Sequence, residues 1–95
     1  MELLLIIDVK GLENKEIFNK HLKKEGFSSV EGEEFVYTAT STTTTFSTKA
    51  YILEVVKVGL SKTSFESCKL IFQLDELPFQ GFVFDKTTND FEVAQ

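Results

Sequence analysis

The hydrophobic pattern of the chain begins with a continuous apolar run and then becomes periodic. Residues 3–9 read LLLIIDV, which is typical of a strand at the centre of a sheet or of one covered on both faces. Beyond Gly11, apolar residues recur with helical spacing from Ile17 to Leu22, with lysines and acids between them. We therefore predict a first strand followed by an amphipathic helix that ends at Gly26, with Phe27 folding back as its apolar contact.

Residues 27–40 predict a hairpin. Residues 27–30 and 35–40 are rich in strand-forming side chains, and the acidic, glycine-containing segment 31–33 between them is typical of a turn. In the second arm, Phe35, Tyr37 and Ala39 fall on one face and the intervening residues on the other. Hydroxyl side chains dominate the following segment 41–45, which we expect to be a mobile loop that ends in a helix cap.

The second half of the chain predicts another helix and further strands. Residues 49–60 are so rich in β-branched side chains that a strand competes with a helix, but the length and a cap at Ser47 and Thr48 favour a helix that ends near Gly59. Residues 68–74, CKLIFQL, alternate as a strand does. After a turn at 75–78 we expect a last arm at 82–84, while residues 91–93 pair weakly or fray.

This order of elements predicts one α+β domain that spans residues 1–95. We expect a ferredoxin-like βαββαβ sandwich, in which an antiparallel sheet carries two helices on one face and an extra C-terminal strand. Such a sheet leaves its second face uncovered, and the 95 residues include ten phenylalanines. Because exposing apolar surface is costly, we predict a homodimer. The candidate interface residues are Phe79, Phe82, Phe84 and Phe91.

Amino-acid composition and charge limit the kinds of partner that the protein is expected to bind. The net charge is -5, and all ten basic residues are lysines, whereas sequence-specific nucleic-acid readers depend on arginine. No apolar run approaches the roughly 20 residues that span a bilayer, and the opening segment lacks the basic region of a signal peptide, so we expect no membrane association. Cys68 is the only cysteine, which excludes an intrachain disulfide and favours a reducing, cytoplasmic location.

Asp8 is the strongest candidate for chemistry because it interrupts an apolar strand near its end. Two Asp8 carboxylates related by a dimer axis could hold one hard divalent cation such as Mg²⁺, which would orient a water and stabilise a phosphoryl transition state. The alternative is a local role, in which Asp8 accepts hydrogen bonds from turn amides before Gly11 or caps the next helix.

Other polar residues carry weaker signals. His21 lies beside Leu22 and is expected to pack at the boundary of the core, and a single histidine without a motif gives no hydrolase triad. A lysine patch on or beside the first helix could contact a phosphate backbone, although interleaved glutamates favour ordinary ion pairs. Its members are Lys10, Lys15, Lys20, Lys23 and Lys24.

Three stretches resemble the VapD virulence-associated ribonucleases and the related small integration-complex subunits of CRISPR systems. They are LLLIIDV with its terminal Asp8, LKKEGFSSVEGEEFVY and CKLIFQLDELPF. The resemblance implies a ferredoxin-like dimer that cuts RNA or DNA with a metal near Asp8, and Ser29 matches the polar position on the second strand. The chain departs from that family in lacking arginine on the first helix, in its acidic balance and in its threonine-rich loop.

Two functions follow as expectations. The first is a small dimeric protein that acts on RNA as a Mg²⁺-dependent endoribonuclease, with Asp8 and Ser29 as catalytic residues and the lysine patch guiding the backbone. The alternative is a non-catalytic protein-interaction module, such as an antitoxin or a phage-type inhibitor, that uses its acidic surface and apolar sheet face to bind a partner protein. The charge of -5 and the absence of arginine favour the alternative, whereas the position of Asp8 favours the first.

Overall fold

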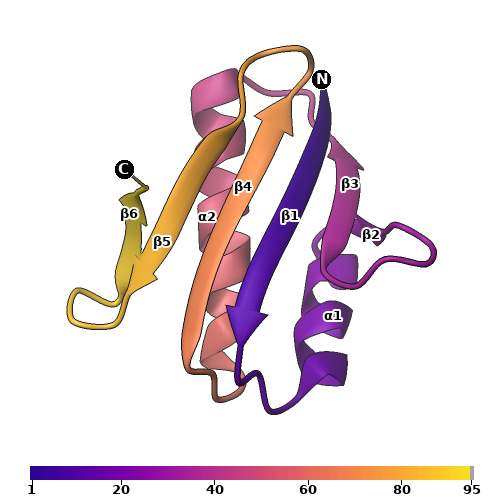
Figure 1. Cartoon of the computed structure of the whole chain (residues 1–95). Helices are drawn as coiled ribbons and strands as arrows, with labels where there is room; N and C mark the ends of the chain where they lie inside the picture. The colour runs from indigo at the N-terminus through magenta and orange to yellow at the C-terminus, as the bar shows by residue number, and fades with distance from the viewer. Residues whose placement is uncertain (95) are drawn as a thin grey trace.

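A computed structural model describes residues 1–94 (Figure 1). The chain is an α+β protein with one antiparallel sheet and two helices, as predicted. Its elements are β1 (Glu2–Lys10), α1 (Lys15–Lys24), β2 (Ser28–Ser29), β3 (Val36–Thr40), α2 (Thr45–Ser61), β4 (Ser67–Leu74), β5 (Gln80–Asp85) and β6 (Asp90–Val93).

The sheet has six strands in the order β2-β3-β1-β4-β5-β6, and every neighbouring pair is antiparallel. The apolar first strand therefore lies near the middle, where Ile6 pairs with Val36 of β3 on one side and with Ile71 of β4 on the other. β3 separates β1 from β2, although β2 comes earlier in the chain. This register decides which side chains of neighbouring strands share a face.

Both helices cover the same face of the sheet, and the core lies between them and the strands (Figure 1). Inward side chains alternate along each strand, as the period of two predicts: Leu5 of β1, Tyr37 of β3 and Phe72 of β4 are almost fully buried. The opposite face carries no helix and is called the open face below. The prediction that β1 is central is confirmed, but only one of its faces is covered.

The first helix begins and ends as its sequence predicts. The Asn14 side chain accepts a hydrogen bond from the Ile17 amide at 3.0 Å, which caps the N-terminus. Gly26 has φ of +99°, and the Phe27 amide then donates to the Leu22 carbonyl at 2.9 Å. Phe18 and Leu22 are buried, but Ile17 is 41% exposed, so the buried stripe is narrower than expected.

The second helix begins earlier than predicted. Thr44 is the cap, because its hydroxyl accepts from the Ser47 amide at 3.1 Å, whereas Ser47 and Thr48 lie inside the helix. The helix also continues past Gly59 to Ser61. A Cβ at Gly59 would lie 3.1 Å from the Phe18 ring, so this glycine lets the two helices pack closely.

The C-terminal region differs most from the prediction. Instead of one extra strand, two strands continue the sheet beyond β4, and residues 90–93 pair in full with β5 instead of fraying. The reason is packing: Phe91 lies opposite Phe84, their rings are 5.2 Å apart, and Phe91 is buried. In residues 1–94 no helix has the length and apolar character needed to cross a bilayer.

Candidate functional site

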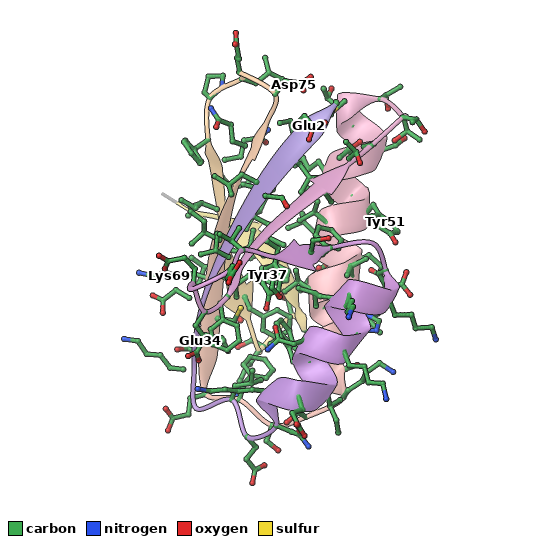
Figure 2. All side chains as sticks on the ribbon, turned by 90° about the vertical axis from the view of Figure 1, so that its right-hand side faces the viewer. Glu2, Glu34, Tyr37, Tyr51, Lys69 and Asp75 are labelled. Atoms are coloured by element: carbon green, nitrogen blue, oxygen red, sulfur yellow. The ribbon has the colours of Figure 1, made fainter. Side chains whose placement is uncertain are left out.

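Asp8 lies on the open face of the sheet and is not buried. Its residue partner in β4 is Lys69, and the two charged groups are 3.7 Å apart, with the side chains 52% and 66% exposed respectively. Figure 2 shows Lys69 pointing away from the helices. Within residues 1–94, no three His, Cys, Asp or Glu side chains gather closely enough to hold a metal ion.

The predicted lysine patch divides in the structure. Lys15 is held by Glu34 at 2.6 Å and lies over the Phe35 ring, as the ion-pair alternative expects. Lys20, Lys23 and Lys24 are exposed on α1 and form no ion pair with any residue from 1 to 94. Lys10 follows Asp8 on β1 and lies far along the chain from those three. The structure therefore leaves three lysines on one helix free to meet an anionic group.

The remaining predicted site residues lie in different environments. Ser29 is exposed on the short edge strand β2. Phe82 and Phe91 are buried in the core of the single chain, and Phe84 packs between Phe65 and Phe91. Phe79 alone among the four candidate interface phenylalanines is exposed, in the β4–β5 turn. Three of these rings already have partners inside the chain, and a role for the four in a dimer remains a prediction.

An apolar band crosses the open face. We define the open-face band as the outward residues Leu4, Ile6, Val36, Ile71 and Val83, which come from four strands. Strand register aligns them, because Ile6 pairs with both Val36 and Ile71. Ile71 and Val83 are 40% and 44% exposed, which is unusual for side chains of this size on central strands.

The band contains a groove of about 210 Å³. Its floor is Gly81 of β5, which pairs with Ile71, and Ala94 closes one side through a hydrogen bond from its amide to the Gly81 carbonyl at 2.9 Å. The absence of a side chain at Gly81 creates the hollow, since a Cβ there would contact the Ile71 methyl at 3.4 Å. Asp8 and Lys69 form the polar rim.

Charge is distributed unevenly around this band. Glu2, Asp8, Asp85 and Glu92 project from the open face, against two lysines, Lys10 and Lys69. Most of the other lysines belong to the two helices on the opposite side. The open face is therefore apolar at its centre and negative at its margin, and such a face attracts a surface of complementary charge.

A second concavity, of about 400 Å³, lies on the helix side, where the end of α1, the end of β3 and the start of α2 meet. Its lining includes Phe27, Thr48 and Tyr51. Sequence patterns indicated neither concavity. The sequence predicted an uncovered, apolar sheet face, but it could not tell which strands lie beside β1 and therefore which residues form the band. The cavity joins segments that are distant in the chain.

Among residues 1–94, the pKa is raised for Cys68, Tyr37 and Tyr51. Burial, and secondarily the Asp8 charge, raises the pKa of the Cys68 thiol to about 12. Burial, with the Glu34 charge second, raises the pKa of Tyr37 well above its ordinary value. Burial and the hydrogen bond to Glu25 raise the pKa of Tyr51. The Cys68 thiol therefore stays protonated at neutral pH and is a poor nucleophile.

Comparisons with protein-family models, with curated proteins and with solved structures found no match for this chain. The function of the chain must therefore be inferred from its own residues. Of the two predicted catalytic residues, Asp8 lines the groove in the open-face band, where Phe82 lies beside it. Other predicted site residues line separate hollows, Phe84 beside α2 and Lys15 and Lys20 on α1.

Proposed function

We propose that this chain is a non-catalytic protein-interaction module that binds a partner protein on its open sheet face. The observation that carries the proposal is the open-face band, in which Ile6, Ile71 and Val83 surround a groove on strands that have no covering layer. Exposed apolar patches rimmed by polar residues are typical of protein interaction sites.

The chemistry of the surface defines the partner. Its centre must be apolar to fill the groove over Gly81, and its rim must be rich in lysine or arginine to meet Asp8, Asp85 and Glu92. The same acids would repel the phosphates of RNA. They would also repel one another if two copies of this chain met face to face, so we favour a different protein as the occupant.

A capture experiment in the native host tests this proposal. The wild-type chain is compared with the double variant Ile71→Glu/Val83→Glu, which adds charge to the groove, and with Phe46→Glu as a control. Phe46 is 81% exposed on the helix side, so its change adds one negative charge away from the groove, where the double variant adds two. We expect wild type and control to retain one stoichiometric partner, whose purified form binds the double variant at least about tenfold more weakly. Binding should also weaken as salt rises.

Two outcomes would contradict the proposal. One is equal binding of the purified partner by the double variant and the control, with both variants folded by circular dichroism. The other is the absence of any stoichiometric partner when the wild-type chain is expressed at its native level.

A second candidate, metal-dependent cleavage of RNA by a homodimer, is favoured by the position of Asp8. Asp8 is exposed at the margin of the band, so a dimer formed through the open face would bring two Asp8 carboxylates toward each other. A shared Mg²⁺ would offset their repulsion. This candidate requires a dimer that strengthens with Mg²⁺ in light scattering and RNA cleavage that disappears in Asp8→Asn; a Mg²⁺-independent monomer, or equal cleavage by the variant, would exclude it.

We also propose that the fold is ferredoxin-like. The order β2-β3-β1-β4 and the two helices on one face support this assignment, while β5 and β6 are additions at the β4 edge. The VapD resemblance remains an expectation beside it.

A further inference from the structure

The cavity on the helix side differs from the open face in position and in chemistry. Its floor is apolar and made by Leu3, Phe27 and Ala39, while the loop after β3 and the first turns of α2 supply most of the rim. Its volume of about 400 Å³ lies within the range of small-molecule sites. Tyr51 forms one wall, and its ring stacks on Phe27 with centroids 6.2 Å apart and planes 10° apart. Figure 2 shows Tyr51 on the helix side, away from the open face.

Three hydroxyls of the rim are hydrogen-bonded in a ring. Thr48 is 2% exposed, and its Oγ1 lies 2.6 Å from Ser41 Oγ and 3.2 Å from Thr43 Oγ1, while Ser41 and Thr43 are 3.2 Å apart. Each hydroxyl has a single proton, and three protons suffice to close the ring. Ser41 Oγ also accepts from the Thr43 amide at 3.2 Å, so the lone pairs left over belong to Thr43 and Thr48. The unused capacity of the ring is then lone pairs, which accept hydrogen bonds.

The opposite side of the rim also accepts hydrogen bonds. The Tyr51 hydroxyl donates to the Glu25 carbonyl and to Glu25 Oε2, both at 2.9 Å, which uses its only proton. The second carboxylate oxygen of Glu25 is left with acceptor capacity. Glu25 is the only charged side chain in the lining, so an anionic group inside the cavity would be repelled.

We infer that this cavity binds a nucleobase that carries an exocyclic amino group. A flat, uncharged ring can stack on the Tyr51 wall above the apolar floor, and its amino group can donate to the free carboxylate oxygen of Glu25. The Thr40, Thr42 and Ser47 hydroxyls of the lining can act as donors or as acceptors, so Glu25 supplies the preference for a donor. A phosphate cannot share the cavity with Glu25. Lys23 and Lys24 immediately precede Glu25 and lie exposed on α1, outside the lining, where a phosphate attached to the base can be met.

Matched nucleosides give the test. Cytidine and uridine differ in the amino or carbonyl group at one ring position, and adenosine and inosine differ in the same way. Titrations of the wild-type chain followed by amide chemical shifts should give saturable binding of cytidine and adenosine, at least about tenfold tighter than of uridine and inosine, because a carbonyl in place of the amino group would face the Glu25 carboxylate. The shifts should map to residues 25–27, 41–43 and 47–51.

Variants and phosphate-bearing ligands sharpen the result. Thr48→Val keeps the side-chain volume but opens the hydroxyl ring, and Tyr51→Leu removes the stacking wall; each should weaken adenosine at least about tenfold, while Phe46→Ala should not. A free nucleoside site predicts equal affinity for adenosine and AMP, whereas a site for the base of a single strand predicts tighter, salt-sensitive binding of AMP and oligoadenylate that is lost in Lys23→Ala/Lys24→Ala.

The inference is overturned by any of three results. These are the absence of saturable binding of all four nucleosides at millimolar concentration, equal binding of cytidine and uridine, and affinity that is unchanged in both Thr48→Val and Tyr51→Leu when these variants are folded. Binding of spermidine without binding of adenosine would also overturn it, because the rim would then be selecting a cation.

Discussion

The two faces of the sheet are made by the same strands, yet they have opposite characters. On the covered face, Phe72 of β4 is fully buried and stacks on Phe82 at 5.8 Å; on the open face, the next residue, Ile71, is 40% exposed. The covered face satisfies its apolar side chains within the chain. The open face keeps apolar side chains in contact with water, where they add little to stability and are available to a partner. Substitutions at two neighbouring residues can therefore change the stability of the chain and its binding of a partner separately.

The largest expected effect on stability distinguishes Phe72 from its neighbour Ile71. Phe72→Ala should lower the free energy of unfolding by about 3–5 kcal/mol, because it removes a fully buried ring and leaves a cavity. Ile71→Ala should cost less than about 1 kcal/mol, because its side chain is already partly in water. Urea denaturation measures both, and similar losses would show that the open face is as tightly packed as the covered one.

High pH should weaken the covered face in a defined window. The pKa of Cys68 is raised from 9.0 to about 12 in the folded chain, so the unfolded chain releases this proton first as the pH rises. The free energy of unfolding should therefore fall by about 2 kcal/mol between pH 9 and pH 11 on account of this thiol, and it continues to fall until the pH passes the folded pKa. The same titration of Cys68→Ala lacks this contribution, and equal slopes for the two chains would contradict the raised pKa.

Two glycines distinguish close packing from an open groove. Gly59→Ala should destabilise the chain by about 1 kcal/mol, because the buried Phe18 ring lies 3.1 Å from the new Cβ and the gain in helix propensity only partly compensates. Gly81→Ala meets Ile71 at an ordinary 3.4 Å and should stabilise by about 0.5 kcal/mol while filling the groove.

Thermal unfolding compares the stabilities of the two glycine variants. The affinity of each variant for the partner is the second measurement. Gly81→Ala should bind the partner less well although it is at least as stable as wild type. A Gly81→Ala chain that is less stable than Gly59→Ala would show that the groove is not the open feature described above.

The smallest effect is expected at the ion pair of the open face. Lys69→Ala removes the partner of Asp8, but both side chains are more than half exposed, and exposed pairs of this kind contribute less than about 0.5 kcal/mol. Chemical denaturation at low and high salt should give nearly equal stabilities for wild type and variant. A loss above about 1 kcal/mol at low salt would show that the pair of Asp8 and Lys69 stabilises the fold.

Local sequence patterns predicted most helices and strands, because hydrophobic periodicity and helix ends depend on residues that are close together in the chain. Gly26 and Phe27 ended α1 as expected, and alternation placed Tyr37 and Phe72 in the core. The predicted cap of α2 was at the wrong residue. Besides Thr44, six residues from 41 to 48 carry hydroxyls that can cap a helix, and the local sequence does not show which of them does so. Residues 91–93 were expected to pair weakly or fray, and the extent of the observed pairing was not predictable because it depends on Phe91 meeting Phe84.

The candidate sites were less predictable than the fold, since they depend on register and on distant segments. Asp8 was expected to be an acid embedded in apolar surroundings, but its face of β1 is open and Lys69 lies opposite. The groove requires Ile6, Ile71 and Gly81 to be aligned across three strands. Thr48 and Tyr51 become parts of one cavity only when α2 packs beside the end of α1.

The place of β1 in the sheet has a consequence for synthesis of the chain. This strand leaves the ribosome before the other strands of the sheet, but one of its long edges stays without a hydrogen-bonding neighbour until β4, which begins at Ser67, has also emerged. Through most of translation the segment LLLII is therefore an apolar strand with one unpaired edge. This makes it the segment of this chain most exposed to chaperones and to aggregation.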